Sequence, residues 1–149
     1  MTVDLNCDLG ESFGAYTIGN DAEILKIISS ANIACGFHGG DPLVMHYTIE
    51  MAVQNGVGIG AHPGFNDLWG FGRRRIQMPA HEVEKMLIYQ VGALQGMARA
   101  QGAAVTHYKI HGALGNMACV EPDLAAAAAR AVKAVAPELI FVVLPRSEL

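Results

Sequence analysis

Short apolar runs alternate along the chain with longer segments whose apolar residues recur at helical spacing, and glycine or proline stands at most of the joins. The apolar runs predict strands at residues 3–8, 32–37, 57–62, 105–111 and 139–144. The segments between them predict helices at residues 22–29, 42–55, 80–101 and 123–136. This alternation is typical of a parallel sheet, open or closed into a barrel, so we expect an α/β fold.

Each of the first four predicted strands has two unlike faces, because successive side chains point in opposite directions. One face carries bulky residues suited to lie under helices, and the other is small or polar, with Gly36, Gly58 and Gly60 leaving room for a ligand. The polar face ends in a charged or imidazole group on every strand: Asp8, His38, His62, and Lys109 with His111. The carboxyl ends of parallel strands meet at one edge, so we expect these groups to converge on a common hollow.

The composition favours one folded, mildly acidic domain over residues 1–149. Hydrophobic residues make up 52% of the chain and charged residues 16%, which is enough apolar material for a sizeable core. The net charge is −4, and the basic cluster at Arg73, Arg74 and Arg75 is short. A chain without a basic stripe is poorly suited to coat nucleic acid or anionic lipid, so we expect neither as a partner.

Cysteine usage and the N-terminal stretch favour a cytoplasmic location. The three cysteines are scattered singly, without a C-x-x-C pair, which is typical of reduced thiols. No signal-peptide pattern opens the sequence, and no apolar run is long enough to span a membrane.

The stretch DLNCDLGES places Asp8 at a predicted strand end and Glu11 in the following loop. Both could act as general bases or metal ligands. Alternatively, Asp8 caps a turn and Glu11 is solvated. The accumulation of polar groups on one strand face leaves these two interpretations about equally supported.

The stretch GFHGGDP contains His38 and Asp41, and His62 stands at the equivalent end of the next strand. Two neutral imidazoles with a carboxylate suit a zinc-type site, and they equally suit metal-free acid–base chemistry. Asp41 precedes Pro42, so it is expected to be a helix N-cap that can also face the site.

Lys109 and His111 lie two residues apart on the polar face of the fourth strand. A buried lysine needs an anion, which could be a ligand carboxylate or phosphate or the carboxylates of Asp8 and Glu11. Asn116 could hydrogen-bond a ligand amide or cap the following helix.

A long loop follows the third strand and carries Arg73 and Arg74 beside two glycines. Such loops often cover active sites, and arginine binds carboxylate or phosphate through two points. A solvated basic turn explains the same residues. The chain contains neither of the common glycine-rich nucleotide-binding signatures.

Four stretches, DLNCDLGESFG, SANIACGFHGGDP, GIGAHPGFNDLWGFGRR and KIHGALGNMA, resemble the LamB/YcsF family in their order and spacing. The resemblance implies a (β/α) barrel-like domain related to metal-dependent polysaccharide deacetylases. It also implies an activity: with partner subunits B and C, opening the lactam of 5-oxo-L-proline to L-glutamate, coupled to ATP hydrolysis. ATP would then be a co-substrate, and a divalent metal is an open alternative.

Carried onto this chain, the resemblance marks ten polar residues. Catalytic roles are expected for Asp8, Glu11, His38, His62, Lys109 and His111. Binding of substrate or phosphate is expected for Asp41, Arg73, Arg74 and Asn116. If a metal is bound, its expected ligands are Asp8, His38 and His62.

The chain departs from the family pattern in sequence and in length. Ile110 replaces a usual proline, Gly115 a usual tyrosine and Arg146 a usual glycine. A closed barrel of this type needs about 250 residues, so we expect this chain to be the N-terminal part of one. An incomplete sheet leaves an edge uncovered, which favours association, including homo-oligomers.

Two other functions stay open. The chain could be a stand-alone metal-dependent amidase or deacetylase that uses Asp8, His38 and His62. It could also be a non-catalytic subunit whose polar cavity holds a ligand.

Overall fold

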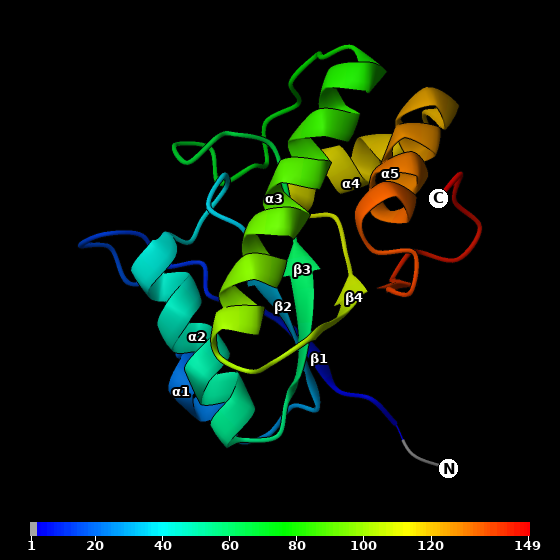
Figure 1. The fold of residues 1–149 in the computed structure, drawn as a ribbon. Helices are drawn as coiled ribbons and strands as arrows, with labels where there is room; N and C mark the ends of the chain where they lie inside the picture. The colour runs from blue at the N-terminus through cyan, green and yellow to red at the C-terminus, as the bar shows by residue number, and fades with distance from the viewer. Residues whose placement is uncertain (1–2) are drawn as a thin grey trace.

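A computed structural model describes residues 3–149 and contains a five-stranded parallel sheet (Figure 1). The strands are β1 (Asn6–Leu9), β2 (Ser30–Ala34), β3 (Gly58–His62), β4 (Val105–Tyr108) and β5 (Ile140–Phe141). Their order in the sheet follows their order in the sequence, and all four neighbouring pairs are parallel. The expected parallel α/β fold is confirmed, as an open sheet with β1 and β5 at its edges.

Helices connect the strands, and α2 and α3 lie on the viewer's side of the sheet in Figure 1. The helices are α1 (Asp21–Ile24), α2 (Pro42–Gln54), α3 (Ala80–Ala100), α4 (Gly112–Ala118) and α5 (Pro122–Val135). The bounds of α2, α3 and α5 agree with prediction to within a residue. By contrast, α1 ends earlier than predicted. The helix α4 was not predicted, because it contains glycines, which are unfavourable in helices.

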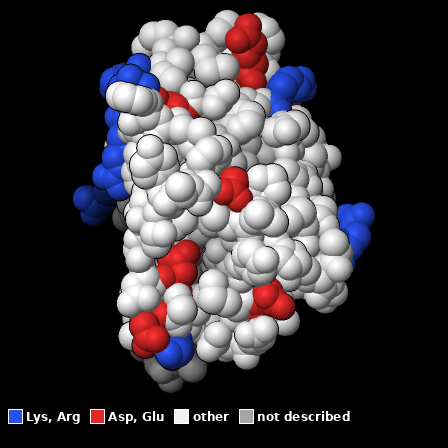
Figure 2. Space-filling view, turned by 90° about the vertical axis from the view of Figure 1, so that its left-hand side faces the viewer, with Lys and Arg blue, Asp and Glu red and all other residues white. Residues whose placement is uncertain are grey.

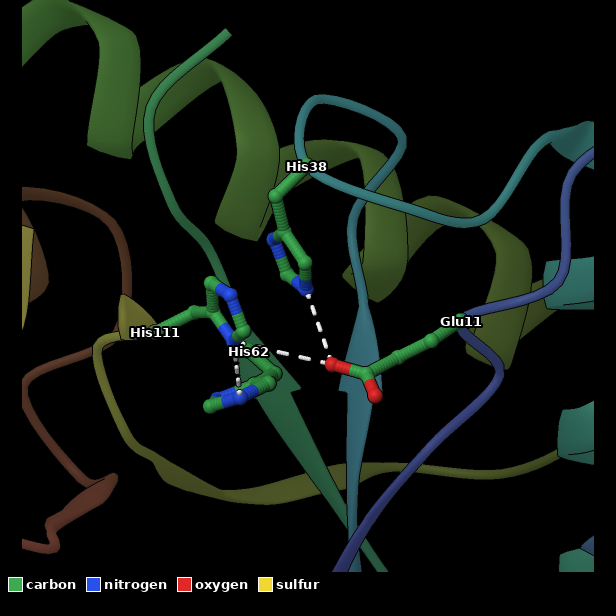
Figure 3. Close-up of side chains that lie close together, drawn as sticks. All are labelled: Glu11, His38, His62 and His111. Atoms are coloured by element: carbon green, nitrogen blue, oxygen red, sulfur yellow. Dashed lines mark hydrogen bonds and ion pairs between the residues drawn. The ribbon is translucent and has the colours of Figure 1, made fainter. Parts of the chain in front are cut away.

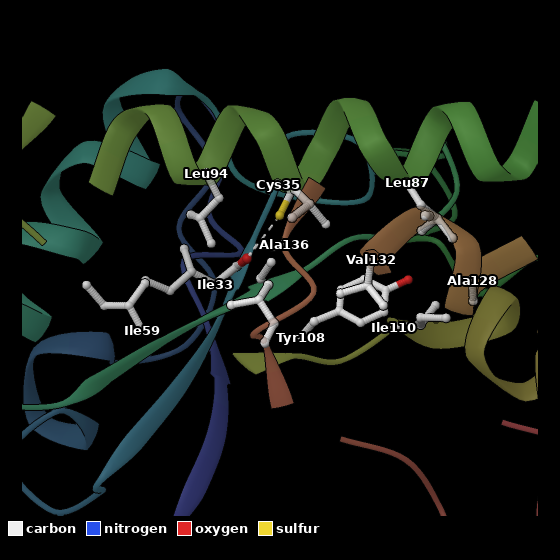
Figure 4. Close-up of a cluster of buried hydrophobic side chains, with 14 of the residues drawn as sticks. Ile33, Cys35, Ile59, Leu87, Leu94, Tyr108, Ile110, Ala128, Val132 and Ala136 are labelled. Carbon is white, nitrogen blue, oxygen red and sulfur yellow. Dashed lines mark hydrogen bonds between the residues drawn. The ribbon is translucent and has the colours of Figure 1, made fainter. Parts of the chain in front are cut away.

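The hydrophobic core lies between the sheet and α3, which also packs along α5 (Figure 4). Leu87, Leu94 and Ile33 are fully buried there, beside Tyr108. The predicted bulky face therefore lies under the helices in β2, β3 and β4, whereas Val3 and Leu5, before β1, are exposed. Burying a leucine side chain contributes about 2 kcal/mol, so this layer stabilises the packing of α3 on the sheet.

The opposite face of the sheet is polar, as predicted, and its side chains are linked to one another. Asn32 is fully buried on β2; its Nδ2 donates to Asp8 Oδ1 over 2.7 Å, and its Oδ1 accepts from His107 Nε2 over 3.0 Å. The expected open space beside Gly60 is absent, because the ring of His107 lies directly against this glycine. The polar face is thus partly filled by its own side chains.

Strand β4 ends at Tyr108 rather than His111, but its backbone pairing continues. Lys109 N donates to Ala61 O over 2.9 Å, and His111 N donates to Pro63 O over 2.8 Å. This pairing keeps the alternation of side chains beyond the regular strand. Lys109 and His111 consequently stay on the polar face.

The backbone at Arg146 has φ +63°, in the left-handed region that favours glycine. This observation gives a physical reason for the glycine that the family resemblance leads one to expect there. The arginine in this chain adopts the same turn at a steric cost.

The surface turned to the viewer in Figure 2 carries scattered acidic side chains, while lysine and arginine lie toward its margins. On this face the basic side chains do not gather into a patch. Among the helices of residues 3–149, none is both long and apolar enough to cross a bilayer.

Candidate functional site

Four side chains meet where β1 to β4 end, and Figure 3 shows them pointing toward one another. His62 ends β3, whereas Glu11, His38 and His111 follow β1, β2 and β4 in the adjoining loops. One ligand atom from each lies within 4.8 Å of the others. The three histidines are buried and Glu11 is half-buried. Imidazole and carboxylate are donor types that bind zinc, so this cluster is a candidate metal centre.

Backbone carbonyls orient two of the imidazoles. His62 Nδ1 donates to the carbonyl of Lys109 over 2.8 Å, and His111 Nε2 donates to the carbonyl of Phe71 over 2.8 Å. The other nitrogens of the two rings, His62 Nε2 and His111 Nδ1, lie 3.0 Å apart. A backbone hydrogen bond on one nitrogen thus fixes each ring with its other nitrogen directed toward the other ring.

His38 completes the cluster by stacking on His111, with ring centroids 3.6 Å apart and planes within 2° of parallel. Its Nε2 lies 3.2 Å from Glu11 Oε1, whereas its buried Nδ1 has no partner. Burial lowers the pKa of His38 and lowers that of His111 to about 4, because a charged imidazole loses hydration there. Both rings are neutral near pH 7.

Asp8 lies beside this cluster and belongs to an ion pair with Lys109. Its Oδ1 accepts from Lys109 Nζ over 2.7 Å, and its Oδ2 lies 3.3 Å from His62 Nε2. Burial alone would raise the pKa of the Asp8 carboxyl, but the neighbouring His62 ring and the hydrogen bonds from Lys109 and Asn32 outweigh it, and the pKa is lowered. Of the anions considered for Lys109, the structure provides Asp8.

A cavity of about 310 Å³ opens next to the ion pair. Its polar lining includes Asp8, His62, Arg73, Lys109 and Asn116, and its opposite wall is apolar, formed near β5. This volume is at the lower end of the range for small-molecule sites. A small polar ligand with a negative charge would meet the cations Lys109 and Arg73 and the side-chain amide of Asn116 here.

The structure brings most of the predicted site residues together, in the cluster or around the cavity, but leaves two outside both. Arg74 is mostly exposed and pairs with Asp67. Asp41 caps α2, accepting from the amides of Leu43 and Val44 over 2.8 and 3.0 Å, and its other oxygen accepts from Gly14 N over 2.7 Å. The binding roles of Arg74 and Asp41 stay predictions. Asn116 lies within α4 and does not cap the helix that follows, because the N-cap position of α5 is Glu121.

Two features of the site escaped the sequence reasoning. The carbonyl of Phe71 orients His111, and the side-chain amide of Asn32 donates a hydrogen bond to Asp8. Phe71 has φ +54°, between two glycines of its loop, so the Gly-Phe-Gly stretch was a usable signal for an unusual turn. Asn32 lies on the polar face of its strand, but its partner depends on strand register, which the sequence pattern does not specify.

Comparisons with known proteins agree with the sequence resemblance. The LamB/YcsF family matches residues 3–149. The chain is 60% identical over 147 residues to the 5-oxoprolinase A subunit of Heliobacterium modesticaldum, covering 99% of this chain and 58% of the relative. It is 56% identical to the protein of the same name from Natranaerobius thermophilus, covering 99% of this chain and 57% of the relative.

The fold also matches a crystal structure, that of the lactam utilization protein from Thermus thermophilus. The TM-score is 0.97 at 50% sequence identity, over 99% of this chain and 60% of that protein. The chain thus spans somewhat more than half the length of the relatives that it matches.

Proposed function

Because the chain belongs to the LamB/YcsF family, we propose that it acts as the A component of an ATP-dependent 5-oxoprolinase. The reaction would open the lactam of 5-oxo-L-proline to L-glutamate, with ATP as co-substrate and subunits B and C as partners. The observation that carries this proposal is the cavity beside Asp8 and Lys109, in a chain whose relatives bear that name.

The chemistry explains why ATP is needed. The lactam amide is stabilised by resonance, so its carbonyl carbon is a poor electrophile. Transfer of the γ-phosphoryl group to the amide oxygen releases ADP and activates that carbon. Water then adds, the ring C–N bond breaks with its electron pair staying on nitrogen, and nitrogen takes a proton. A second water hydrolyses the resulting acyl phosphate to glutamate and phosphate.

The cavity offers groups for each part of this sequence. Lys109 and Arg73 are cations that would hold the substrate carboxylate or the transferred phosphoryl group. Asn116 would hydrogen-bond the lactam amide. The imidazoles of His62 and His111 would carry protons between water and the ring nitrogen. Asp8 would keep Lys109 in place and charged.

The test is reconstitution. The chain is mixed with subunits B and C, ATP and 5-oxoproline, and glutamate and ADP are measured together. We expect equimolar products, and we expect Lys109→Met and Asp8→Asn to reduce the rate by about 100-fold or more, as loss of a charge-stabilising group does. His81→Gln, at an exposed position on α3, is the matched control.

A full-length relative from Heliobacterium modesticaldum is assayed in parallel. If that relative forms glutamate under these conditions and this chain does not, the activity cannot be assigned to the chain.

An ATP-independent amidase or deacetylase is a second candidate, favoured by the cluster of Glu11 with three histidines. Hydrolysis of simple amides without ATP would support it. A third candidate, a non-catalytic ligand-binding subunit, predicts that Lys109→Met weakens ligand affinity in a protein that never turns the ligand over.

A further inference from the structure

We propose that Glu11, His62 and His111 bind a single divalent transition-metal ion of the Zn²⁺ type, with His38 as the fourth donor. The proposal concerns the residues in Figure 3 and does not depend on which reaction the protein catalyses.

The backbone contacts determine where each ring carries its proton. A carbonyl oxygen only accepts hydrogen bonds, so His62 must donate from Nδ1 to Lys109, and His111 must donate from Nε2 to Phe71. In the neutral rings the remaining nitrogens, His62 Nε2 and His111 Nδ1, are therefore both acceptors. They face each other at 3.0 Å with no proton to share.

Further acceptors surround the same point. Glu11 Oε1 lies 3.6 Å from His111 Nδ1, and Asp8 Oδ2 lies 3.3 Å from His62 Nε2. Lone pairs gathered this closely in a buried place repel one another unless a cation lies between them. The geometry thus points to a positive charge at the centre of the cluster.

Three of the six separations between the donor atoms are close to those around a tetrahedral ion, and all six are within 4.8 Å. Ligands bound to zinc at about 2.1 Å lie about 3.4 Å from each other in a tetrahedron. The three separations along the cluster are 3.0 Å from His62 to His111, 3.6 Å from His111 to Glu11 and 3.2 Å from Glu11 to His38. Nitrogen-rich donor sets favour zinc and its neighbours over magnesium or calcium, which prefer oxygen.

The supporting contacts also rank the ligands. Histidines that bind metals usually donate their second N–H to a carbonyl or carboxylate, as His62 and His111 do. His38 lacks such a partner on Nδ1, so its ring is less firmly oriented. Asp8 is engaged by Lys109 and Asn32 and is not one of the four closest donors. The expected order of importance is therefore His62, His111 and Glu11 first and His38 after them.

The experiment measures metal binding directly on the purified chain. After removal of metal with a chelator, Zn²⁺ is titrated by calorimetry, and Co²⁺ is titrated by its visible absorption, which reports tetrahedral nitrogen and oxygen ligands. We expect one ion per chain. Glu11→Gln, His62→Asn and His111→Asn should each weaken binding by about 100-fold or more, and His38→Asn by less. His81→Asn, at an exposed position on α3, should leave binding unchanged.

Failure of the folded wild-type chain to bind either ion at millimolar concentration would overturn the proposal, and would indicate a proton in place of the metal. Equal binding by wild type and Glu11→Gln would also overturn it. Glu11→Gln keeps the size of the side chain, so this variant decides the matter even if a variant of a buried histidine does not fold. The readout is binding, so a negative result here is distinct from a failure to form glutamate.

Discussion

At the scale of single residues, the contact between Gly60 and His107 sets a limit on what the polar face can hold. A methyl group at position 60 would overlap the His107 ring. We expect Gly60→Ala to push the ring away, to break its hydrogen bond to Asn32 and to lower the free energy of unfolding by about 3 kcal/mol. Urea unfolding followed by circular dichroism measures this change.

Gly58, in the same strand, is the matched control. A methyl group there would make only ordinary contacts, the nearest at 3.5 Å to the Ser29 carbonyl. Gly58→Ala should alter stability by less than about 1 kcal/mol. Equal losses at both glycines would show that overlap with His107 is not the cause.

His107 also makes stability depend on pH. Burial lowers its pKa from 6.5, partly offset by the charge of Asp4. In the unfolded chain this imidazole takes up a proton near its ordinary pKa of about 6.5, whereas in the folded chain it does so only at lower pH. The contribution of neutral His107 to the free energy of unfolding should therefore be complete above pH 6.5. Below that value the free energy of unfolding should fall as the pH drops.

Urea unfolding at intervals between pH 8 and pH 5, with a chelator present, measures this dependence. In His107→Gln the free energy of unfolding should fall less below pH 6.5 than in the wild type. Some fall should remain, because burial lowers the pKa of His38 and His111 as well. An unchanged slope would contradict the assignment to His107.

Period-two alternation was sufficient to predict which side chains of β1, β3 and β4 lie on the polar face, and hence that His62 and Lys109 converge with Asp8. His38 lies in the loop beyond the end of β2, so alternation does not account for its position. The same reasoning could not place the Glu11 carboxylate against His38, since both lie in loops. Nor could it show that Arg74 pairs with Asp67, because that contact depends on how the loop after β3 folds back on itself.

At the scale of elements, the start of α2 depends on one carboxylate. Asp41 accepts hydrogen bonds from two amides of the first turn and from Gly14. Asp41→Ala should lower the free energy of unfolding by about 1–2 kcal/mol, because these amides lose their partner. Thermal and urea unfolding measure the loss.

Asp123 in the first turn of α5 is a suitable comparison, since no side-chain cap bond is present at that helix start. Its replacement by alanine should change stability by about 0.5 kcal/mol or less. A loss as large as that at Asp41 would indicate a general charge effect and not capping.

Helices with clear start signals were the easiest elements to predict. Pro42 after Asp41, and Pro122 at the start of α5, marked two of them. The helix α4 was missed because the seven residues GALGNMA include two glycines and come directly after the strand predicted at residues 105–111. Its first residue, Gly112, has φ +57° and contacts Gly72, so the helix start is dictated by packing against a distant loop.

At the scale of the whole molecule, the two sheet edges expose apolar side chains. Ile140 in the edge strand β5 is 68% exposed, and Leu5 beside β1 is also exposed. Unpaired strand edges pair readily with other chains. We expect the 149-residue chain to self-associate at micromolar concentrations, as judged by sedimentation velocity.

A charge on the edge should reverse this association. Ile140→Lys should shift the chain toward monomer, because lysine on an edge strand disfavours pairing. Val120 is equally exposed, at 68%, but lies outside the sheet, so Val120→Lys serves as control. If both substitutions act alike, general surface hydrophobicity and not the strand edge drives association.

The order of the strands has a consequence for how the protein is made. Each strand pairs with the one that precedes it in the sequence, so every new strand finds its neighbour already synthesised. Proteins leave the ribosome N-terminus first, at about 5–20 residues per second, and can fold as they emerge. All four donors of the candidate metal centre lie between Glu11 and His111. A nascent chain could thus assemble this centre, and capture its ion, while translation of the remainder is still under way.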